Sequence, residues 1–354
     1  MTETPGWTSP GSPEAAPGPA DSGHRTPPAG TATATAAGPG AQPAGTPAVG
    51  PIPLRPLGVG ELMDGSFALV RRHWRVALGF SLGFAAFLQL VQAGVDWWIH
   101  LNGTSVEDLF SNYLTLPLAL LLGTFVTGLL APVVSAALLG RETSHGTVWA
   151  QVRPRFGALV ALSLLHLLVL AVAFAAPIVP VLALTGFTAE PLLILLLPIA
   201  VLPGAWLWIA LSWTAPALIL EKQSVLGAFR RSWRLVRGAW WRTFGVMLLF
   251  GLVCGLVTIS VIGPASFASD LLRGDDPSDG TVALTIALTG VFAAFAKTLT
   301  LPLQAVLITL LYVDRRIRRE ALDLELARAA GLPGYSWTDR PAAPVPGPAT
   351  PPGV

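Results

Sequence analysis

Residues 67–74 read FALVRRHW, and the same arrangement returns as WAQVRPRF at 149–156 and WRLVRGAW at 233–240. Each octet has an aromatic residue, a valine, an arginine and a second aromatic residue at fixed places: Phe67, Val70, Arg71 and Trp74; Trp149, Val152, Arg153 and Phe156; Trp233, Val236, Arg237 and Trp240. The even spacing of the octets indicates three internal repeats. An octet is too charged to cross a bilayer and too aromatic for an ordinary hydrated loop, so we expect it at a membrane interface.

The octets belong to longer patterns that predict amphipathic helices. At about 100° per residue, the third helix has one stripe made of Val225, Phe229, Trp233, Val236 and Trp240, and an opposite side made of Arg230, Arg231, Arg234, Arg237 and Arg242. The first helix has an equivalent stripe of Val59, Met63, Phe67, Val70 and Trp74, opposed by Arg71, Arg72 and Arg75. Such helices lie flat in the interface, with aromatic side chains toward the acyl chains and arginines toward phosphates.

The ends of these helices can also be predicted. Gly58 and Ser224 precede the first and third helices at equivalent places, and we expect Ser224 to be an N-cap. Pro154 should break the last turn of the middle copy, so a shorter, bent element is expected there.

A simpler interpretation is that the octets are only the basic flanks of cytoplasmic loops. That interpretation explains the arginines but not the aromatic residues at matched positions.

The amphipathic interpretation predicts contact with membrane lipids, and with anionic headgroups in particular. The residues expected at this lipid interface are Phe67, Arg71, Trp74, Trp149, Arg153, Phe156, Arg230, Trp233, Arg234, Arg237 and Trp240.

Composition indicates an integral membrane protein. The 354 residues are 53% hydrophobic and only 12% charged, whereas soluble domains carry roughly 25% charged residues. Stretches long enough to span a bilayer predict an all-α, polytopic fold with six transmembrane helices. They are Val76–Ile99, Leu114–Leu139, Gly157–Leu184, Leu192–Leu220, Thr243–Ile262 and Val282–Val313. With one amphipathic helix before each pair of spans, the prediction is three parallel hairpin repeats around a central axis.

Basic residues orient these spans. Of the 22 lysines and arginines, all but Arg273 and Lys297 lie in the N-terminal segment, in the second and fourth connections or after the last span. By the positive-inside rule, both termini face the cytoplasm of a multi-pass plasma-membrane protein. The net charge of +2 gives no indication of nucleic-acid binding.

The two ends of the chain differ from the middle in composition. Residues 1–53 are rich in proline, alanine and glycine, and residues 331–354 repeat this pattern. Both are predicted to be disordered tails because they cannot bury a core. The membrane domain is therefore expected at residues 54–330, with a charged cytoplasmic helix from Asp314 to Ala330.

The last span runs into a motif that resembles a known family. The motif, within LPLQAVLITLLYVDRRIRREALDLELARAA at 301–330, contains Tyr312, Asp314, Arg316, Arg318, Glu320 and Asp323. It is similar to the signature of the membrane-domain family named after glycerophosphoryl diester phosphodiesterases. The opening IPLRPLGVGELMDGSFALVRRH at 52–73 is similar to the entry of that domain in actinobacterial members.

The resemblance implies the membrane part of that family without its hydrolase. The catalytic module there is a separate soluble barrel, and a barrel of about 250 residues does not fit in this chain. The sequence has no metal-ligand spacing, nucleophile triad or cofactor fingerprint. We therefore expect no enzyme activity and no cofactor.

Polar residues at membrane depth are the remaining functional candidates. They are Gln89, Gln92, His166, Lys297 and Gln304. Interhelical hydrogen bonding is the favoured interpretation of the amides and the histidine. For Lys297, snorkelling toward the outer interface and a buried functional role are both open, with Asp96 as the plausible carboxylate partner.

Two functions follow from these patterns. The first, which the sequence favours, is a non-enzymatic scaffold or accessory protein that docks a protein partner at its cytoplasmic face through the interfacial helices and the charged C-terminal helix. The second is a small-molecule or lipid transporter. A transporter predicts a hydrated cavity lined by Gln89, Gln92, His166 or Lys297, whereas a scaffold predicts a close-packed interior.

Overall fold

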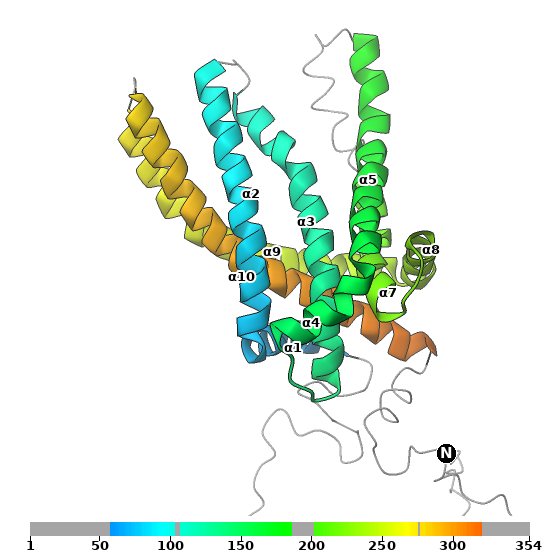
Figure 1. Ribbon diagram of the computed structural model, residues 1–354. Coiled ribbons are helices and arrows are strands. Elements are labelled where there is room, and N and C mark those ends of the chain that lie inside the picture. The colour runs from blue at the N-terminus through cyan, green and yellow to red at the C-terminus, as the bar shows by residue number, and fades with distance from the viewer. Residues whose placement is uncertain (1–56, 103–106, 186–201, 275–276, 321–354) are drawn as a thin grey trace, which may run out of the picture. The chain divides into compact units, whose positions relative to one another are not determined.

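The computed structural model describes residues 57–102, 107–185, 202–274 and 277–320, and these residues form helices and short connections (Figure 1). The predicted tails, the second half of the charged C-terminal helix and Asp323 lie outside the described residues. The element order is α1 (Val59–Arg72), α2 (Trp74–Asn102), α3 (Glu107–Leu138), α4 (His145–Val152), α5 (Phe156–Thr185), α7 (Thr214–Leu220), α8 (Val225–Val236), α9 (Trp240–Arg273) and α10 (Asp279–Glu320).

In the described part of the chain, six helices are long and apolar enough to cross a membrane. They overlap the six predicted spans, and the all-α prediction is confirmed. Several helices are longer than predicted: α9 continues to Arg273, and α10 is a single helix of 42 residues. The charged segment that begins at Asp314 directly continues the last apolar helix, up to Glu320 in the described part of the chain.

The short helices α1, α4 and α8 each precede a pair of long segments, as the octets predict. Ser224 is the N-cap of α8 and accepts a hydrogen bond from the N–H of Gly227 at 3.2 Å. At α1, Gly58 is the N-cap and its N–H donates to the Glu61 carboxylate at 2.7 Å. The middle helix α4 is shorter and passes at Arg153 into a 3₁₀ turn that contains Pro154, which confirms the predicted break.

These three helices lie at one common end of the long helices, which we call the basic end. Arg155, next to α4, donates to the carbonyl of Gln223, next to α8, at 2.7 Å. Leu57, next to α1, contacts Asp314 near the last turns of α10. The opposite end, where α2 and α9 finish and α10 begins, is called the far end (Figure 1).

Each amphipathic helix has three faces rather than the two predicted. In α8 the buried side chains are those of Ala228, Ser232 and Leu235, beside the aromatic stripe, and that of Val236, which belongs to the predicted stripe. Trp233 in the stripe remains 38% exposed, and Phe67 in α1 remains 41% exposed. A narrow apolar face therefore packs on the protein, the aromatic face is half-covered, and most arginines point away.

The hydrophobic core lies in the basic half of the structure. It joins α3, α5, α7 and α8 to α10, with Val126 and Leu130 of α3 and Leu310 and Leu311 of α10 fully buried. Helix α10 packs against α1, α2, α3 and α9, so α10 lies at the centre of this group of helices.

A turn at residues 211–213 interrupts the fourth long segment just before α7. The side chain of Ser232 compensates for the break: its hydroxyl donates to the carbonyl of Ala210 at 2.8 Å and accepts from the N–H of Trp213 at 3.2 Å. The turn was not predicted, although Pro216 follows it in the first turn of α7 and lacks the N–H that would bond to the carbonyl of Ser212.

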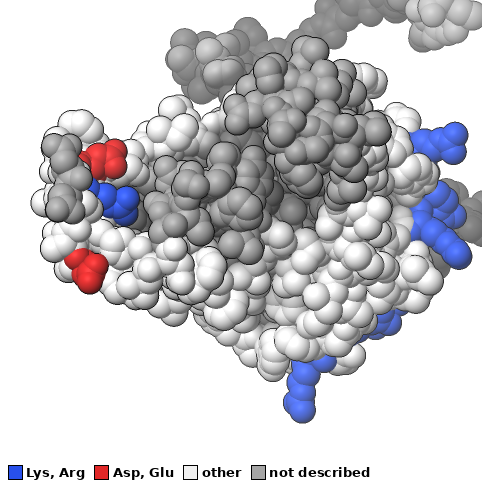
Figure 2. All heavy atoms as spheres, turned by 90° about the horizontal axis from the view of Figure 1, so that it is seen from above, with Lys and Arg blue, Asp and Glu red and all other residues white. Residues whose placement is uncertain are grey.

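Toward the far end, large apolar side chains are exposed instead of buried. On α9, Leu256, Ile259 and Leu271 each expose about 70% of their surface. Viewed from the far end, most of the described surface carries no charge, and basic side chains project mainly at the rim (Figure 2).

Candidate functional site

The buried carboxylate of Asp314 organises one cluster at the basic end. The side chain is fully buried, and its Oδ1 accepts a hydrogen bond from the backbone N–H of Leu57 at 2.8 Å. Its Oδ2 forms ion pairs with Arg242 at 2.6 Å and with Arg318 at 3.0 Å. Both arginines also donate to the carbonyl of Leu57 at 2.8 Å. The segment before α1, the start of α9 and the end of α10 are thus tied together at one point.

A second cluster forms around Glu221, just after α7. Tyr312 donates its hydroxyl proton to Glu221 in a short hydrogen bond. Arg231 of α8 donates to Glu221 at 2.8 Å and to Glu320 at 2.5 Å. Arg316 lies 3.0 Å from Glu320 and 3.2 Å from Glu221. Burial alone disfavours the charge on Arg231, but the hydrogen bonds that Arg231 donates to Glu320 and Glu221 outweigh this effect and raise the pKa of Arg231.

Two further arginines of α10 close the end of α8. Arg315 donates to the carbonyl of Leu235 at 3.1 Å, and Arg319 donates to the carbonyl of Arg234 at 3.0 Å. The last carbonyls of a helix lack partners within the helix and carry partial negative charge. Guanidinium groups from α10 therefore hold the C-terminal end of α8 in place.

The described part of the C-terminal signature is thus engaged within the molecule. Tyr312, Asp314, Arg316, Arg318 and Glu320 all contact residues of the basic end that precede α10 or lie within its own last turns. The partners Glu221, Arg231 and Arg242 were missed as functional residues at the sequence level. A signal existed for Glu221, which is an isolated acidic residue in an otherwise basic connection.

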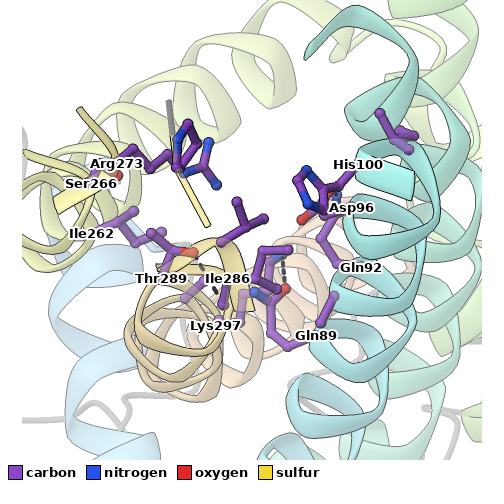
Figure 3. Close-up of a pocket in the computed structure, with 16 residues that line it drawn as sticks. Gln89, Gln92, Asp96, His100, Ile262, Ser266, Arg273, Ile286, Thr289 and Lys297 are labelled. Carbon is purple, nitrogen blue, oxygen red and sulfur yellow. Dashed lines mark hydrogen bonds between the residues drawn. The ribbon is translucent and has the colours of Figure 1, made fainter. Parts of the chain in front are cut away.

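A polar cavity of about 670 Å³ lies at the other end of the long helices, between α2, α9 and α10 (Figure 3). Helix α2 contributes Gln89, Gln92, Asp96 and His100, and α9 contributes Ser266 and Arg273. Helix α10 contributes Thr289 and Lys297. These polar side chains come from helices that also expose large apolar side chains, such as Leu90 on α2 and Leu256 on α9.

Lys297 and Gln89 mark the inner part of this cavity. The Lys297 ammonium donates to Oε1 of Gln89 at 2.9 Å, which joins α10 to α2 (Figure 3). Gln89 is buried and lies near the middle of α2, fifteen residues after Trp74. Among the described residues, Lys297 forms no ion pair. The predicted interhelical role of Gln89 is therefore confirmed, while the expected Asp96 partner of Lys297 is replaced by a neutral amide.

Charged groups of both signs lie in the part of the cavity that is nearer the far end of the helices. Gln92 donates to Asp96 at 2.9 Å, one turn further along α2. His100 lies 3.0 Å from Asp279 at the start of α10. Arg273, at the end of α9, is exposed and donates to the hydroxyl of Thr285 at 3.0 Å. The sequence prediction missed Arg273 as a lining residue because it lies beyond the predicted end of its span.

The remaining predicted polar residues lie in a separate, smaller cavity. His166 and Gln304 line a space of about 250 Å³ together with Thr124. The hydroxyl of Thr124 and Nδ1 of His166 are 3.2 Å apart, which gives a hydrogen bond between α3 and α5. His166 and Lys297 therefore line different cavities, and the predicted interhelical hydrogen bond of His166 is confirmed.

The predicted lipid-interface residues remain accessible on the described surface. Phe67, Trp74, Trp149, Phe156 and Trp233 expose between 38% and 53% of their surface. Trp240 is more enclosed and stacks on Phe244 with ring centroids 5.3 Å apart. The arginines of this set are exposed, namely Arg71, Arg153, Arg230, Arg234 and Arg237. Their contact with lipid stays a prediction.

The comparison with known families identifies one match. The sequence model of a family described as a domain of unknown function, DUF7847, matches residues 77–314, more than half of the chain. The chain belongs to this family. No curated protein and no solved structure gives a significant match.

The DUF7847 segment begins in α2 and ends in α10 on Asp314. The polar cavity lies wholly inside the segment, as do Glu221, Arg231 and Arg242. Leu57 and α1 precede it, and Arg316, Arg318 and Glu320 follow it. The DUF7847 description gives no activity, and the resemblance to the glycerophosphoryl diester phosphodiesterase membrane domains stays a prediction.

Proposed function

We propose that this protein is a multi-pass membrane protein with six spans and with both termini in the cytoplasm. Six apolar helices and the large exposed apolar surface of α9 support insertion into a bilayer. The basic end carries the arginines of α1, α4 and α8, so the positive-inside rule places it in the cytoplasm. The polar cavity then lies in the outer half of the membrane.

We also propose that the chain contains three parallel hairpin repeats whose first helices rest on the cytoplasmic leaflet. The element order supports this proposal, because α1, α4 and α8 each precede a pair of long apolar segments. Their aromatic stripes are half-exposed next to exposed arginines, which suits an interfacial helix. The repeats are unequal, since α4 is short and α10 takes the central position.

Within this topology, the protein binds a small polar ligand from the outer side and acts as a small-molecule or lipid transporter without enzyme activity. The main support for this proposal is the environment of Lys297. A lysine at membrane depth costs several kcal/mol unless it pairs or contacts water. Lys297 instead donates to a neutral amide and lines a cavity whose size is typical of ligand sites.

The alternative of a docking scaffold has less support. The described signature residues are bonded within the molecule, so a partner of the C-terminal helix would compete with existing ion pairs. Among the described residues, the hydrophobic core lies in the basic half and a large polar cavity lies in the far half, whereas a scaffold predicts close packing throughout.

A cysteine-accessibility experiment tests the proposal. The single native cysteine, Cys254, is buried and is first replaced by alanine. Thr289→Cys then places a thiol in the cavity, and Phe295→Cys places one on an exposed apolar face of the same helix. In intact cells, a membrane-impermeant thiol reagent should modify the first variant and leave the second unmodified. If Thr289→Cys stays unmodified from outside, the cavity is not an outward-facing hydrated site.

A further inference from the structure

An apolar groove of about 540 Å³ runs alongside the polar cavity, also between α2 and α10. Small side chains leave room for it: Ala86 and Ala93 on α2, and Ala287, Gly290 and Ala294 on α10. Gln89, Ala93, Ile286 and Gly290 line both the groove and the cavity, so the two spaces adjoin along the same pair of helices.

The groove has the length of one membrane leaflet. On α2 it extends from Ala86 to Trp97, and this separation along a helix corresponds to roughly 16 Å. Half of a typical hydrocarbon core is roughly 15 Å. An acyl chain therefore fits along the groove, with Trp97 at the level where aromatic side chains meet the interface.

The charges of the cavity favour an anion. Lys297 at the inner part and Arg273 nearer the far end are basic, and Asp96 supplies one negative charge (Figure 3). These lining groups leave one net positive charge. A phosphodiester carries one negative charge and accepts strong hydrogen bonds from ammonium and guanidinium groups.

We propose that the ligand is a monoanionic phospholipid. Its phosphodiester headgroup occupies the polar cavity near Lys297, and one acyl chain passes Gly290 into the apolar groove. This inference rests on the proposed function, because it names the ligand class of the same site. It adds a requirement that a soluble solute does not have, namely occupation of the groove.

Binding to the purified full-length protein in neutral detergent tests the inference. Native mass spectrometry measures three probes: dioctanoyl phosphatidylglycerol, dioctanoyl phosphatidylcholine and the deacylated headgroup glycerophosphoglycerol. The charged lipid should bind with one copy per protein and roughly tenfold more tightly than the zwitterionic lipid. The deacylated headgroup should bind far more weakly than either lipid, because it buries no apolar surface.

Three variants separate the two parts of the site. Lys297→Met should remove the preference for the charged lipid. Gly290→Leu fills the groove, and because no atom lies within 4 Å of a Cβ built at Gly290, the change should not strain the fold. It should weaken both lipids roughly tenfold and the deacylated headgroup less, because Gly290 lines the polar cavity as well as the groove. Gly251→Leu, at an exposed glycine of α9 that is equally open, is the matched control and should change nothing.

The outcomes separate this inference from the function on which it rests. Unchanged lipid affinity in Gly290→Leu, or a deacylated headgroup that binds as tightly as the lipid, overturns the phospholipid assignment and leaves a solute site. If none of the three probes binds but the thiol of Thr289→Cys is labelled from outside, the phospholipid assignment alone is overturned. If the thiol of Thr289→Cys is not labelled from outside, the proposed function itself is contradicted.

Discussion

The carboxylate of Asp314 and the backbone N–H of Leu57 are separated by 257 residues along the chain and by 2.8 Å in the structure. The carbonyl of Leu57 accepts from Arg242 and Arg318, which themselves pair with Asp314. One buried carboxylate therefore joins the residue before α1 to α9 and α10. The Asp314 carboxylate also accepts the hydrogen bond of the Leu57 N–H, which would otherwise be buried without a partner.

Removal of this charge should destabilise the protein strongly. Asp314→Asn keeps the shape of the side chain but leaves Arg242 and Arg318 without their counter-charge. Loss of one partner of a buried ion pair costs about 3–5 kcal/mol, so the free energy of unfolding in mixed micelles should fall by that order. Asp270→Asn, on the exposed surface near the far end of α9, should leave it within about 0.5 kcal/mol of the wild type. Equal stability of both variants would show that the Asp314 cluster contributes nothing.

Tyr312 and Glu221 should be energetically coupled. The hydroxyl of Tyr312 donates a hydrogen bond to the Glu221 carboxylate. A hydrogen bond to a charged group contributes about 1.5–3 kcal/mol. Tyr312→Phe and Glu221→Gln should therefore be less costly together than the sum of the two single changes. A double-mutant cycle on unfolding free energies measures the difference, expected at about 0.5–3 kcal/mol. Tyr312→Phe combined with Gln92→Ala, in the distant cavity, serves as the additive control, and additivity in both cycles refutes the coupling.

The sequence predicted the elements of this fold well because their signals are local. Apolar runs of membrane-spanning length, the Ser224 N-cap and the break at Pro154 each depend on a few neighbouring residues. The stabilising partner of the turn at 211–213, Ser232, could not be predicted because it lies in another helix. No local pattern near residue 211 reports that a hydroxyl from α8 will satisfy the exposed backbone groups.

The candidate site was predicted only in part for the same reason. Lys297 and Gln89 stood out as polar residues inside apolar runs, and both line the cavity. Their mutual hydrogen bond and the contribution of Arg273 depend on how α2, α9 and α10 meet. The signature arginines looked like a docking surface because their partners, Glu221 and the Leu57 carbonyl, are remote in sequence.

The end of α8 should loosen when its arginine contacts from α10 are removed. Arg315 and Arg319 donate to the carbonyls of Leu235 and Arg234, and each bond contributes about 0.5–1.5 kcal/mol. Arg315→Met with Arg319→Met should therefore speed amide hydrogen exchange in the last turn of α8 by roughly two- to tenfold or more. Exchange in α4, which neither arginine contacts in the described structure, is the internal control. Unchanged exchange in α8 would mean that its own packing suffices to hold the helix end.

The aromatic stripes of α1 and α8 should be covered by lipid and not by protein. Phe67 and Trp233 are about 40% exposed in the isolated chain, so the fold alone does not shield them. In a Cys254→Ala background reconstituted in liposomes, Phe67→Cys and Trp233→Cys should react with a charged maleimide roughly tenfold more slowly than Arg71→Cys and Arg234→Cys. Detergent exchange controls for burial by protein, because a residue shielded by the fold stays slow after the bilayer is removed. Equal rates for aromatic and arginine positions in liposomes contradict the interfacial placement, because a helix lying flat at the membrane surface cannot expose both faces equally to water.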